Sequence, residues 1–259
     1  MIKTLSLCVL LASLPLPGQL SPPNATGVSM GHLHFNVSDV DASLRFWQTL
    51  GGKTVKVGRL DVVKFRDVLV VLRKADPSGG TPDSVVNHVG FRIPNLQEAV
   101  TRWKAAGLEI QPGTNPKQVF VFGPGPTKIE MTEDPSLTVP IANHHIHFYT
   151  ASVTDTQAWY VKHFGAKAGK RAQFEAADVP GVNLTFSAAP SALAPTKGRA
   201  LDHIGFEVRN LEQFCRNLEA DGIHFDMSYR EVPDLKIHIA FLTDPWGTYI
   251  ELTEGLDRW

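Results

Sequence analysis

The segment HIGFEV at residues 203–208 has three near-copies, HLHFNV at 32–37, HVGFRI at 88–93 and HIHFYT at 145–150. All of them share one order: His, an aliphatic residue, His or Gly, Phe, any residue, and then Val, Ile or Thr. Their first residues lie 56, 57 and 58 positions apart. A period this regular predicts a chain built from four copies of one structural module.

The residues that follow each copy are also repeated. Seven positions after each leading histidine stands a residue type that is preferred at helix N-caps, namely Asp39, Asn95, Ser152 and Asn210. Apolar residues then recur at helical spacing, and glycines suited to helix ends follow at Gly51, Gly107, Gly165 and Gly222. Short β-type runs come next, such as KIEMT at 128–132 and TYIELT at 248–253. Each module is therefore expected to be a strand, a helix and about three further strands.

One module is too small to bury a sufficient core alone, so we expect the modules to pair. The run from Pro135 to Pro140 offers a joint after two modules. The expected domains are residues 30–138 and residues 139–259, each containing two modules. The predicted fold is α+β, with the modules paired into two curved, mostly antiparallel sheets and the helices outside.

The composition excludes several classes of protein. The chain has 259 residues, of which 43% are hydrophobic, which is too high for a disordered protein. Its 25 Lys and Arg are balanced by 26 Asp and Glu, so no net charge favours nucleic acid or an anionic membrane. With two cysteines, the chain is not a disulfide-stapled scaffold. A small molecule is the expected partner, and a homo-oligomer is compatible with the sequence.

The first 18 residues, MIKTLSLCVLLASLPLPG, are typical of a secretory signal peptide. The alternative, a buried segment of the mature fold, is disfavoured by Pro15 and Pro17. Residues 19–29 then form a linker, and the mature protein is expected to be secreted or periplasmic, without a membrane anchor. Cys215, which shares a helical face with Leu211 and Leu218, is expected to be a buried thiol.

The repeated module resembles that of the vicinal oxygen chelate superfamily, which includes glyoxalase I, fosfomycin-resistance enzymes, bleomycin-binding proteins and type I extradiol dioxygenases. The pieces that carry this resemblance best are LDHIGFEVRNLE at 201–212 and DPWGTYIEL at 244–252. The resemblance covers nearly all of the chain after about Met30. It implies that paired modules curl into a cup around a divalent metal, held by His on first strands and Glu on a last strand.

Transferred to this chain, the resemblance implies a C-terminal ligand set of His145, His203 and Glu251 and an N-terminal set of His32, His88 and Glu130. Two His and one Glu per site look like the extradiol dioxygenases. This donor set favours Fe(II) or Mn(II), and Zn(II) is compatible. No other cofactor is expected. We favour the C-terminal set, because the DPWG turn before its last strand is replaced by GPGP at 123–126 in the other half.

Four residues, His147, His238, Tyr229 and His224, are candidates for catalytic roles. His147 lies two residues after His145, on the same strand face, and could be an acid or base, an extra ligand or a supporting group; His34 is its counterpart. His144 is expected to face the other way, and Gly90 and Gly205 are expected to leave room for a substrate.

Extradiol enzymes carry a His and a Tyr ahead of the metal Glu, but here Phe241 occupies the Tyr position. His238 and Tyr229 are the remaining catalytic candidates, with His224 a further one. The expected function is an exported, metal-dependent enzyme that acts on a small oxygen-chelating substrate by dioxygenase, lyase or isomerase chemistry. The alternative is a non-catalytic ligand-binding protein similar to the bleomycin-binding members.

Overall fold

The computed structural model describes residues 20–259, and the predicted signal peptide at residues 1–18 lies outside this range. The four α-helices of the described chain are α1 (Val40–Leu50), α2 (Leu96–Ala105), α3 (Val153–Phe164) and α4 (Leu211–Ala220). The strands of the first two modules are β1 (Val28–Val37), β2 (Lys53–Val57), β3 (Leu60–Phe65), β4 (Val68–Lys74), β5 (Val86–Ile93), β6 (Glu109–Pro112), β7 (Gln118–Gly123) and β8 (Thr127–Glu133). Those of the last two are β9 (Ala142–Thr150), β10 (Lys167–Arg171), β11 (Phe174–Val179), β12 (Val182–Ala188), β13 (Leu201–Val208), β14 (Phe225–Val232), β15 (Ile237–Thr243) and β16 (Tyr249–Glu254).

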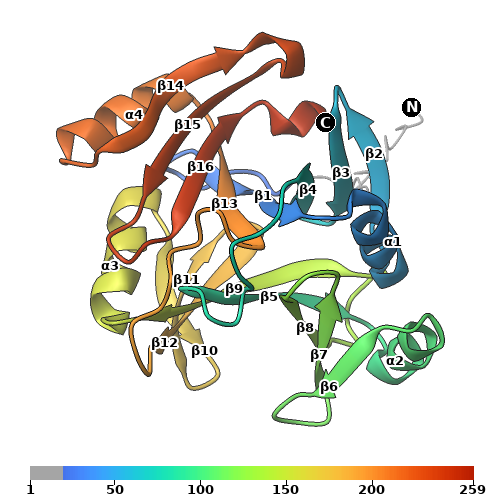
Figure 1. Ribbon diagram of the computed structural model, residues 1–259. Coiled ribbons are helices and arrows are strands. Elements are labelled where there is room, and N and C mark those ends of the chain that lie inside the picture. Colours follow the sequence, from blue (N-terminus) through green and yellow to red (C-terminus); the bar gives the residue numbers. More distant parts are fainter. Residues whose placement is uncertain (1–19) are drawn as a thin grey trace, which may run out of the picture.

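Each module has one strand, one helix and three further strands, as the sequence repeat predicts. Module 1 contains β1–β4, module 2 β5–β8, module 3 β9–β12 and module 4 β13–β16. The strands form two curved sheets in the orders β14-β15-β16-β13-β1-β4-β3-β2 and β10-β11-β12-β9-β5-β8-β7-β6 (Figure 1). Most neighbouring strands are antiparallel, and the parallel pairs join the first and last strands of a module. The predicted α+β fold of paired modules is confirmed.

The modules pair in a different combination from the predicted one. Module 1 pairs with module 4 through β1 and β13, and module 2 pairs with module 3 through β5 and β9. The expected halves, residues 30–138 and 139–259, are therefore not the two sheets. The predicted joint from Pro135 to Pro140 instead lies in the link, residues 134–141, that connects β8 to β9 within one sheet.

The lengths of the connections account for this pairing. Residues 134–141 are a short link, and short links join elements that are neighbours in space. Residues 75–85 and 189–200 are longer, and they carry the chain from one sheet to the other. These two crossovers lie side by side, since Ser78 N–H donates to the carbonyl of Gly198 and Ala200 N–H to that of Gly79, both at 2.9 Å.

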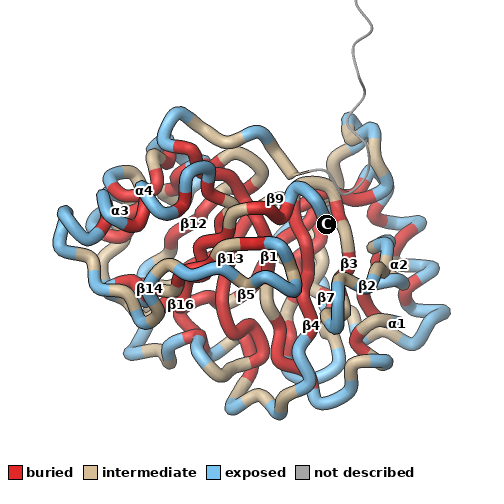
Figure 2. Tube along the Cα trace, turned by 90° about the horizontal axis from the view of Figure 1, so that it is seen from above, coloured by how far each residue is buried: buried red, intermediate tan, exposed pale blue. Residues whose placement is uncertain are grey.

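The main hydrophobic core lies between the two sheets and contains side chains of all four helices, including the predicted buried thiol of Cys215. Along β1 and β5, residues of this core alternate with the repeated histidines, because successive strand residues face opposite sides. The histidines therefore lie on the faces turned away from the main core. We call these concave faces the first cup (modules 1 and 4) and the second cup (modules 2 and 3). Figure 2 shows how burial concentrates in the central strands β1, β13, β5 and β9.

The helices begin and end where the sequence predicts. Asp39 and Asn95 accept a backbone N–H at the starts of α1 and α2, at 2.9 and 3.0 Å, whereas Ser152 and Asn210 occupy the cap positions without such a bond. All four predicted helix-ending glycines, Gly51, Gly107, Gly165 and Gly222, have positive φ angles. Within residues 20–259, no helix combines the length and apolar character needed to cross a membrane.

Candidate metal centre

The repeated histidines and the strand glutamates gather into two clusters, one in each cup. The first cluster consists of His32, His34, His203 and Glu251, and the second of His88, Glu130, His145 and His147. In each cluster, one potential ligand atom per residue lies within 4.8 Å of the others, so both clusters could hold a metal ion. The structure thus brings all six predicted ligands into clusters but regroups them. His145 joins His88 and Glu130 rather than His203, because module 3 pairs with module 2.

Strand register sets the positions of the rings. In the first cup His34 lies opposite His203, and His32 lies opposite Gly205. A Cβ on Gly205 would lie only 2.1 Å from Cε1 of His32. In the second cup, a Cβ on Gly90 would likewise lie 2.0 Å from Cε1 of His145. The glycines therefore make room for the histidine ring of the paired strand, and not for a substrate as predicted.

In the first cluster, two imidazoles converge on one carboxylate oxygen. Glu251 Oε2 lies 3.0 Å from Nε2 of His32 and 2.8 Å from Nε2 of His203. On its other side, Nδ1 of His203 lies 2.6 Å from a carboxylate oxygen of Asp202. A carboxylate in this position orients an imidazole and raises its basicity toward a metal.

The charges of the first cluster are strongly coupled. Burial alone would raise the pKa of Glu251, but the charge of His32 and the hydrogen bonds to His203 and His32 hold it well below its usual value. Burial lowers the pKa of His203, yet its bonds to Asp202 and Glu251 outweigh this and raise it. Glu251 is therefore an anion at neutral pH, and it is buried where a cation would stabilise it.

His34 is a fourth group of the first cluster. Its ring lies 4.3 Å from that of His203, measured between centroids, and its buried Nε2 has no hydrogen-bond partner within residues 20–259. Burial, followed by the charges of His203 and His32, lowers its pKa well below the ordinary value. His34 is thus a neutral imidazole with a free ring nitrogen at neutral pH.

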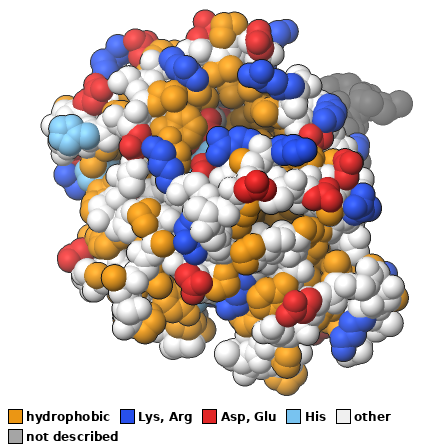
Figure 3. Space-filling view, in the orientation of Figure 1, with side chains coloured by type: hydrophobic (Ala, Val, Ile, Leu, Met, Phe, Trp, Pro, Cys, Tyr) orange, Lys and Arg blue, Asp and Glu red, His pale blue; other side chains and the backbone are white. Residues whose placement is uncertain are grey.

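A cavity of about 350 Å³ opens onto the first cluster. Its walls are largely apolar and include Leu60, Val71, Ile237, Ile239, Phe241 and Trp259. Figure 3 shows hydrophobic side chains lining this hollow, with Lys and Arg side chains along its rim. A volume of this size suits a small ligand.

Tyr249 was missed by the sequence analysis. It lies two residues before Glu251 on β16 and so shares its face, where it lines the cavity. Burial, and then the nearby carboxylates of Asp226, Asp202 and Glu251, raise its pKa to about 12. Its ring stacks on that of Phe241, which lies directly opposite Glu251. A phenol is therefore present in the first cup, although not at the position expected from the extradiol enzymes.

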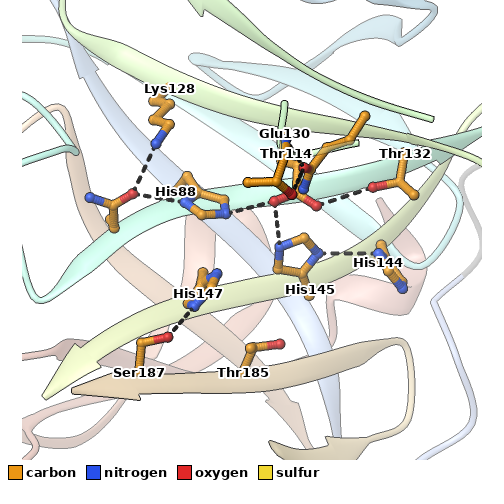
Figure 4. A network of polar contacts seen from close by, with 12 residues as sticks. His88, Thr114, Lys128, Glu130, Thr132, His144, His145, His147, Thr185 and Ser187 are labelled. Atoms are coloured by element: carbon orange, nitrogen blue, oxygen red, sulfur yellow. Dashed lines mark hydrogen bonds and ion pairs between the residues drawn. The ribbon is translucent and has the colours of Figure 1, made fainter. Parts of the chain in front are cut away.

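The second cluster has a similar core but different surroundings (Figure 4). Glu130 Oε2 lies 3.0 Å from Nε2 of His88 and 3.6 Å from Nε2 of His145. Nδ1 of His88 lies 2.8 Å from Oδ1 of Asn87, an amide where the first cluster has the carboxylate of Asp202. His147, a predicted catalytic residue, instead contacts the hydroxyl of Ser187 at 2.8 Å.

The second cluster also contains its own cation. Nη1 of Arg171 lies 3.9 Å from Oε1 of Glu130, and Nε of Arg171 donates to Thr185 at 2.7 Å. The Glu130 side chain is 3% exposed, compared with 11% for Glu251. Burial would raise the pKa of Glu130, but the hydrogen bond to His88 and the charges of His145 and His88 outweigh it and hold the pKa far below its usual value. The charge of Glu130 is thus partly compensated by protein groups.

The other catalytic candidates lie away from both clusters. Ile237, Ile239 and Phe241 line the first cup, so His238 faces the opposite side of β15. There its ring stacks on Tyr229 at a centroid distance of 5.3 Å, and Tyr229 packs against the main core. His224 is exposed. The prediction that His238 and Tyr229 act in this cup does not agree with their positions, because alternation along β15 and β14 turns both side chains to the other face of the sheet, on the side of the main core.

The fold and the clusters define a class of protein: four βαβββ modules paired into two cups, each with a His and Glu cluster. The family model of the Glyoxalase/Bleomycin resistance protein/Dioxygenase superfamily matches residues 29–160 and 142–252. The chain belongs to this superfamily, known as the vicinal oxygen chelate superfamily. No match is found among curated proteins.

Solved structures show the same fold. Glyoxalase I from Zea mays has a TM-score of 0.69 and 15% sequence identity, and the match covers 89% of this chain and 94% of that one. A protein from Bacillus subtilis described as a putative dioxygenase has a TM-score of 0.66 and 11% identity, with 91% and 86% of the two chains covered. At these identities the likeness extends to the fold alone.

Proposed function

We propose that this chain is a divalent-metal-dependent enzyme whose metal is held in the first cluster by His32, His203 and Glu251. One observation carries the proposal: both histidine Nε2 atoms meet the same oxygen of Glu251, at 3.0 and 2.8 Å, next to an apolar cavity. Such a buried anion needs a positively charged partner, and a metal ion supplies one. The buried Nε2 of His34, which has no hydrogen-bond partner in the described chain, also supports the binding of a metal or substrate at this site.

The donor set favours particular metals. Two imidazoles and one carboxylate leave coordination positions open, which suits Fe(II) or Mn(II), with Zn(II) as a further candidate. When bound, the metal would act as a Lewis acid and orient two adjacent oxygens of the substrate. Asp202 would fix the ring of His203 so that its Nε2 faces the metal.

The cavity indicates the class of substrate. At about 350 Å³, with mostly apolar walls, it suits a molecule with one ring or a short alkyl body. The two substrate oxygens would lie at the polar end of the cavity, near the first cluster. We therefore expect a catechol-like or α-hydroxycarbonyl compound, and dioxygenase, isomerase or lyase chemistry.

Two side chains of the cavity would handle protons. Neutral His34 can accept a proton from a substrate hydroxyl, since its Nε2 is free and the ring lines the cavity. Tyr249, whose pKa is about 12, stays protonated and can donate a hydrogen bond to a substrate oxygen. The apolar walls would exclude water and strengthen both interactions.

We assign catalysis to the first cup and not to the second. The second cluster is more deeply buried, and Arg171 already lies near its carboxylate. A positive charge at this distance opposes the binding of a second cation.

We also propose that the protein is exported. Support comes only from residues 1–18, where Lys3 precedes an apolar run that is too short to span a bilayer. N-terminal sequencing of protein recovered from outside the cytoplasm would identify the cleavage site. Recovery of the uncleaved chain in the cytoplasm alone would contradict export.

The decisive experiment combines metal analysis with activity. Metal content is measured by mass spectrometry for the wild type and for His32→Ala, His203→Ala and Glu251→Ala. Oxygen uptake and product formation are then followed with a panel of catechols and α-hydroxycarbonyls. We expect each variant to lose the metal and the activity, whereas the matched variants His88→Ala, His145→Ala and Glu130→Ala keep the activity.

Each outcome has a defined meaning. A wild type that binds no divalent metal near one equivalent per chain would contradict the enzyme proposal. Saturable binding of a panel compound without turnover would favour a ligand-binding protein instead. Loss of activity in the second-cluster variants alone would show that catalysis had been assigned to the wrong cup.

A further inference from the structure

A second cavity, polar and about 390 Å³ in volume, opens at one end of the second cup. It is separate from the cavity of the first cluster, with which it shares no lining residue. Its titratable and charged lining residues are Arg92, His144, Lys170, Arg171, Asp67 and Asp178. The proposed enzyme function does not use this cavity.

A β-bulge brings His144 to this cavity. The pairing of β5 with β9 shifts register between Gly90 and Phe91, because Gly90 lies opposite His145 and Phe91 lies opposite Asn143. His144 is the extra residue, and its Nδ1 lies 3.1 Å from Nδ1 of His145 (Figure 4). The sequence analysis expected it to face away, but the bulge interrupts the alternation along the strand.

The two arginines keep unused hydrogen-bond donors. Nη1 of Arg92 bonds to Asp134 at 3.0 Å, but its buried Nε has no partner within residues 20–259. Nε of Arg171 donates to Thr185, and its Nη1 lies 3.9 Å from a carboxylate oxygen of Glu130. Both guanidinium groups thus have capacity for an anionic ligand.

The two carboxylates of the cavity already have hydrogen-bond partners in the protein. Asp67 accepts a hydrogen bond from Ser21 at 2.7 Å and lies 3.6 Å from Arg66. Asp178 accepts one from Asn183 at 2.7 Å. Lys170 pairs with Glu175 at 2.9 Å. Each arginine also lies near one carboxylate, Asp134 or Glu130, but both keep further N–H donors for a ligand.

The equivalent end of the first cup is built in the opposite way. Glu207 stands four residues after His203, as Arg92 stands four residues after His88. It accepts the N–H groups of Gly255 and Leu256 at 2.7 and 3.2 Å, so its carboxylate is used to hold the segment after β16.

At two other equivalent positions, the second cup has a basic or titratable side chain and the first cup has none. Gly31 precedes His32 where His144 precedes His145, and Val57 ends β2 where Arg171 ends β10. In the first cup this place holds an acidic residue that is bound to the segment after β16, whereas in the second cup it holds basic residues that line a cavity. The contrast lies within one repeated framework, so the basic cavity is a local specialisation and not a consequence of the fold.

We infer that the polar cavity of the second cup binds a small oxyanion, the carboxylate or phosphate group of a metabolite, between Arg92 and Arg171. Both guanidinium groups offer paired N–H donors with a geometry that matches such groups. His144, at the cavity wall, can contribute a further N–H. This site does not depend on a metal in either cluster.

Calorimetric titration of the full chain tests the inference. Inorganic phosphate and malonate are the probes, and sodium chloride at matched ionic strength is the control. All titrations are repeated in a Glu251→Gln background, so that binding to a metal in the first cluster is not counted. We expect saturable binding at one site per chain, and the stronger of the two probes identifies the kind of oxyanion.

Variants locate the binding site. Arg171→Val, which copies the first cup, and Arg92→Gln should each weaken binding by about tenfold or more. Arg102→Gln is the matched control, because this exposed arginine of α2 lies outside the cavity. Arg92 is 38% exposed, so its variant should remain folded even if Arg171→Val proves unstable.

Two results would overturn the inference. The first is no saturable binding of either probe up to about 10 mM, a concentration that would detect even a weak site. The second is an affinity that stays the same in Arg171→Val and Arg92→Gln while circular dichroism shows both to be folded.

Discussion

The imidazole of His32 occupies the space that a side chain on Gly205 would fill. These residues face each other across β1 and β13, and a Cβ on Gly205 would lie 2.1 Å from Cε1 of His32. The second cup repeats the arrangement with His145 and Gly90. A histidine ring of each cluster is therefore positioned by the absence of a side chain in the module paired with it.

Replacing Gly205 by alanine should displace the ring of His32. The new methyl group would overlap the imidazole, so Nε2 would move away from Glu251 and metal affinity should fall by about 10- to 100-fold. Overpacking should also cost about 1–3 kcal/mol of folding stability. Competition with a fluorescent chelator measures the affinity, and chemical unfolding measures the stability.

Gly90→Ala is the matched control for this change. It makes the same overlap with His145 in the second cup, so it should cost similar stability and leave activity in place. Equal metal affinity in Gly205→Ala and the wild type would show that His32 is not a ligand.

The sequence alone located the modules and most residues of the two clusters. The repeat with a period near 57 fixed the order of strands and helices, because every leading histidine stands at the same place in its module. Alternation along strands placed Glu130 and Glu251 on the same face as the histidines. These features depend on local periodicity, which is visible in one sequence.

The pairing of modules could not be derived in this way. The His-x-His modules 1 and 3 each pair with a His-x-Gly module, 4 or 2, and the predicted pairing satisfies this complementarity as well. The choice depends on the lengths and contacts of the connections, such as the bond between Ser78 and Gly198. Long-range contacts of this kind leave no periodic signal in the sequence.

The sequence analysis did not place two side chains correctly, those of His144 and Tyr249. The bulge at His144 interrupts the alternation, so parity gave the wrong face for this residue. Tyr249 shares the parity of Glu251, and that signal could have identified it as a cavity residue. Because Phe241 occupies the position of the Tyr in extradiol enzymes, the phenol was instead expected at Tyr229, on another strand.

The residue that contacts Nδ1 of the histidine, Asp202 at His203 and Asn87 at His88, should influence the metal affinity of each cluster. Asp202→Asn removes the charge that orients His203 and should lower metal affinity of the first cluster by about 10- to 100-fold. The reciprocal change, Asn87→Asp, should strengthen metal binding at the second cluster. Titration with Zn(II) or Mn(II) measures both affinities, and unchanged values in both variants would exclude this role for Asp202.

Removing the hydroxyl of Tyr249 should affect turnover more than metal binding. Tyr249→Phe keeps the ring that stacks on Phe241 but loses the donor, so kcat should fall by about 10- to 100-fold. Metal content should remain that of the wild type. The control is Tyr149→Phe, which removes a phenol hydroxyl from the second cup; this variant should keep the kcat of the wild type. A fall in metal content that parallels the fall in kcat would instead indicate a structural role for Tyr249.

Acid should destabilise the metal-free protein through its buried histidines. Burial, and then the charges of Arg171 and Arg92, lower the pKa of His144 to about 4, from an ordinary value of 6.5. Between these values the unfolded chain binds a proton that the folded chain does not, so stability is present above pH 6.5 and is lost as pH falls toward 4. His144→Gln should therefore reduce the loss between these limits by about 1–3 kcal/mol. Urea unfolding at several pH values, with a chelator present, measures this, and an unchanged pH slope would contradict it.

Arg171 should determine how many metal ions the chain binds tightly. Its guanidinium lies 3.9 Å from the carboxylate of Glu130, so a metal in the second cluster must bind against this positive charge. We expect one tightly bound divalent ion per chain, in the first cluster, and a second only at higher concentration. Arg171→Val removes the charge and should strengthen the second binding event by about tenfold or more, while Glu130→Gln in the same background should abolish it. Equilibrium dialysis with Mn(II) distinguishes the two events, because Glu251→Gln removes the first alone. If the wild type already binds two equivalents with equal affinity, Arg171 does not act as the competing cation, and both cups are metal centres.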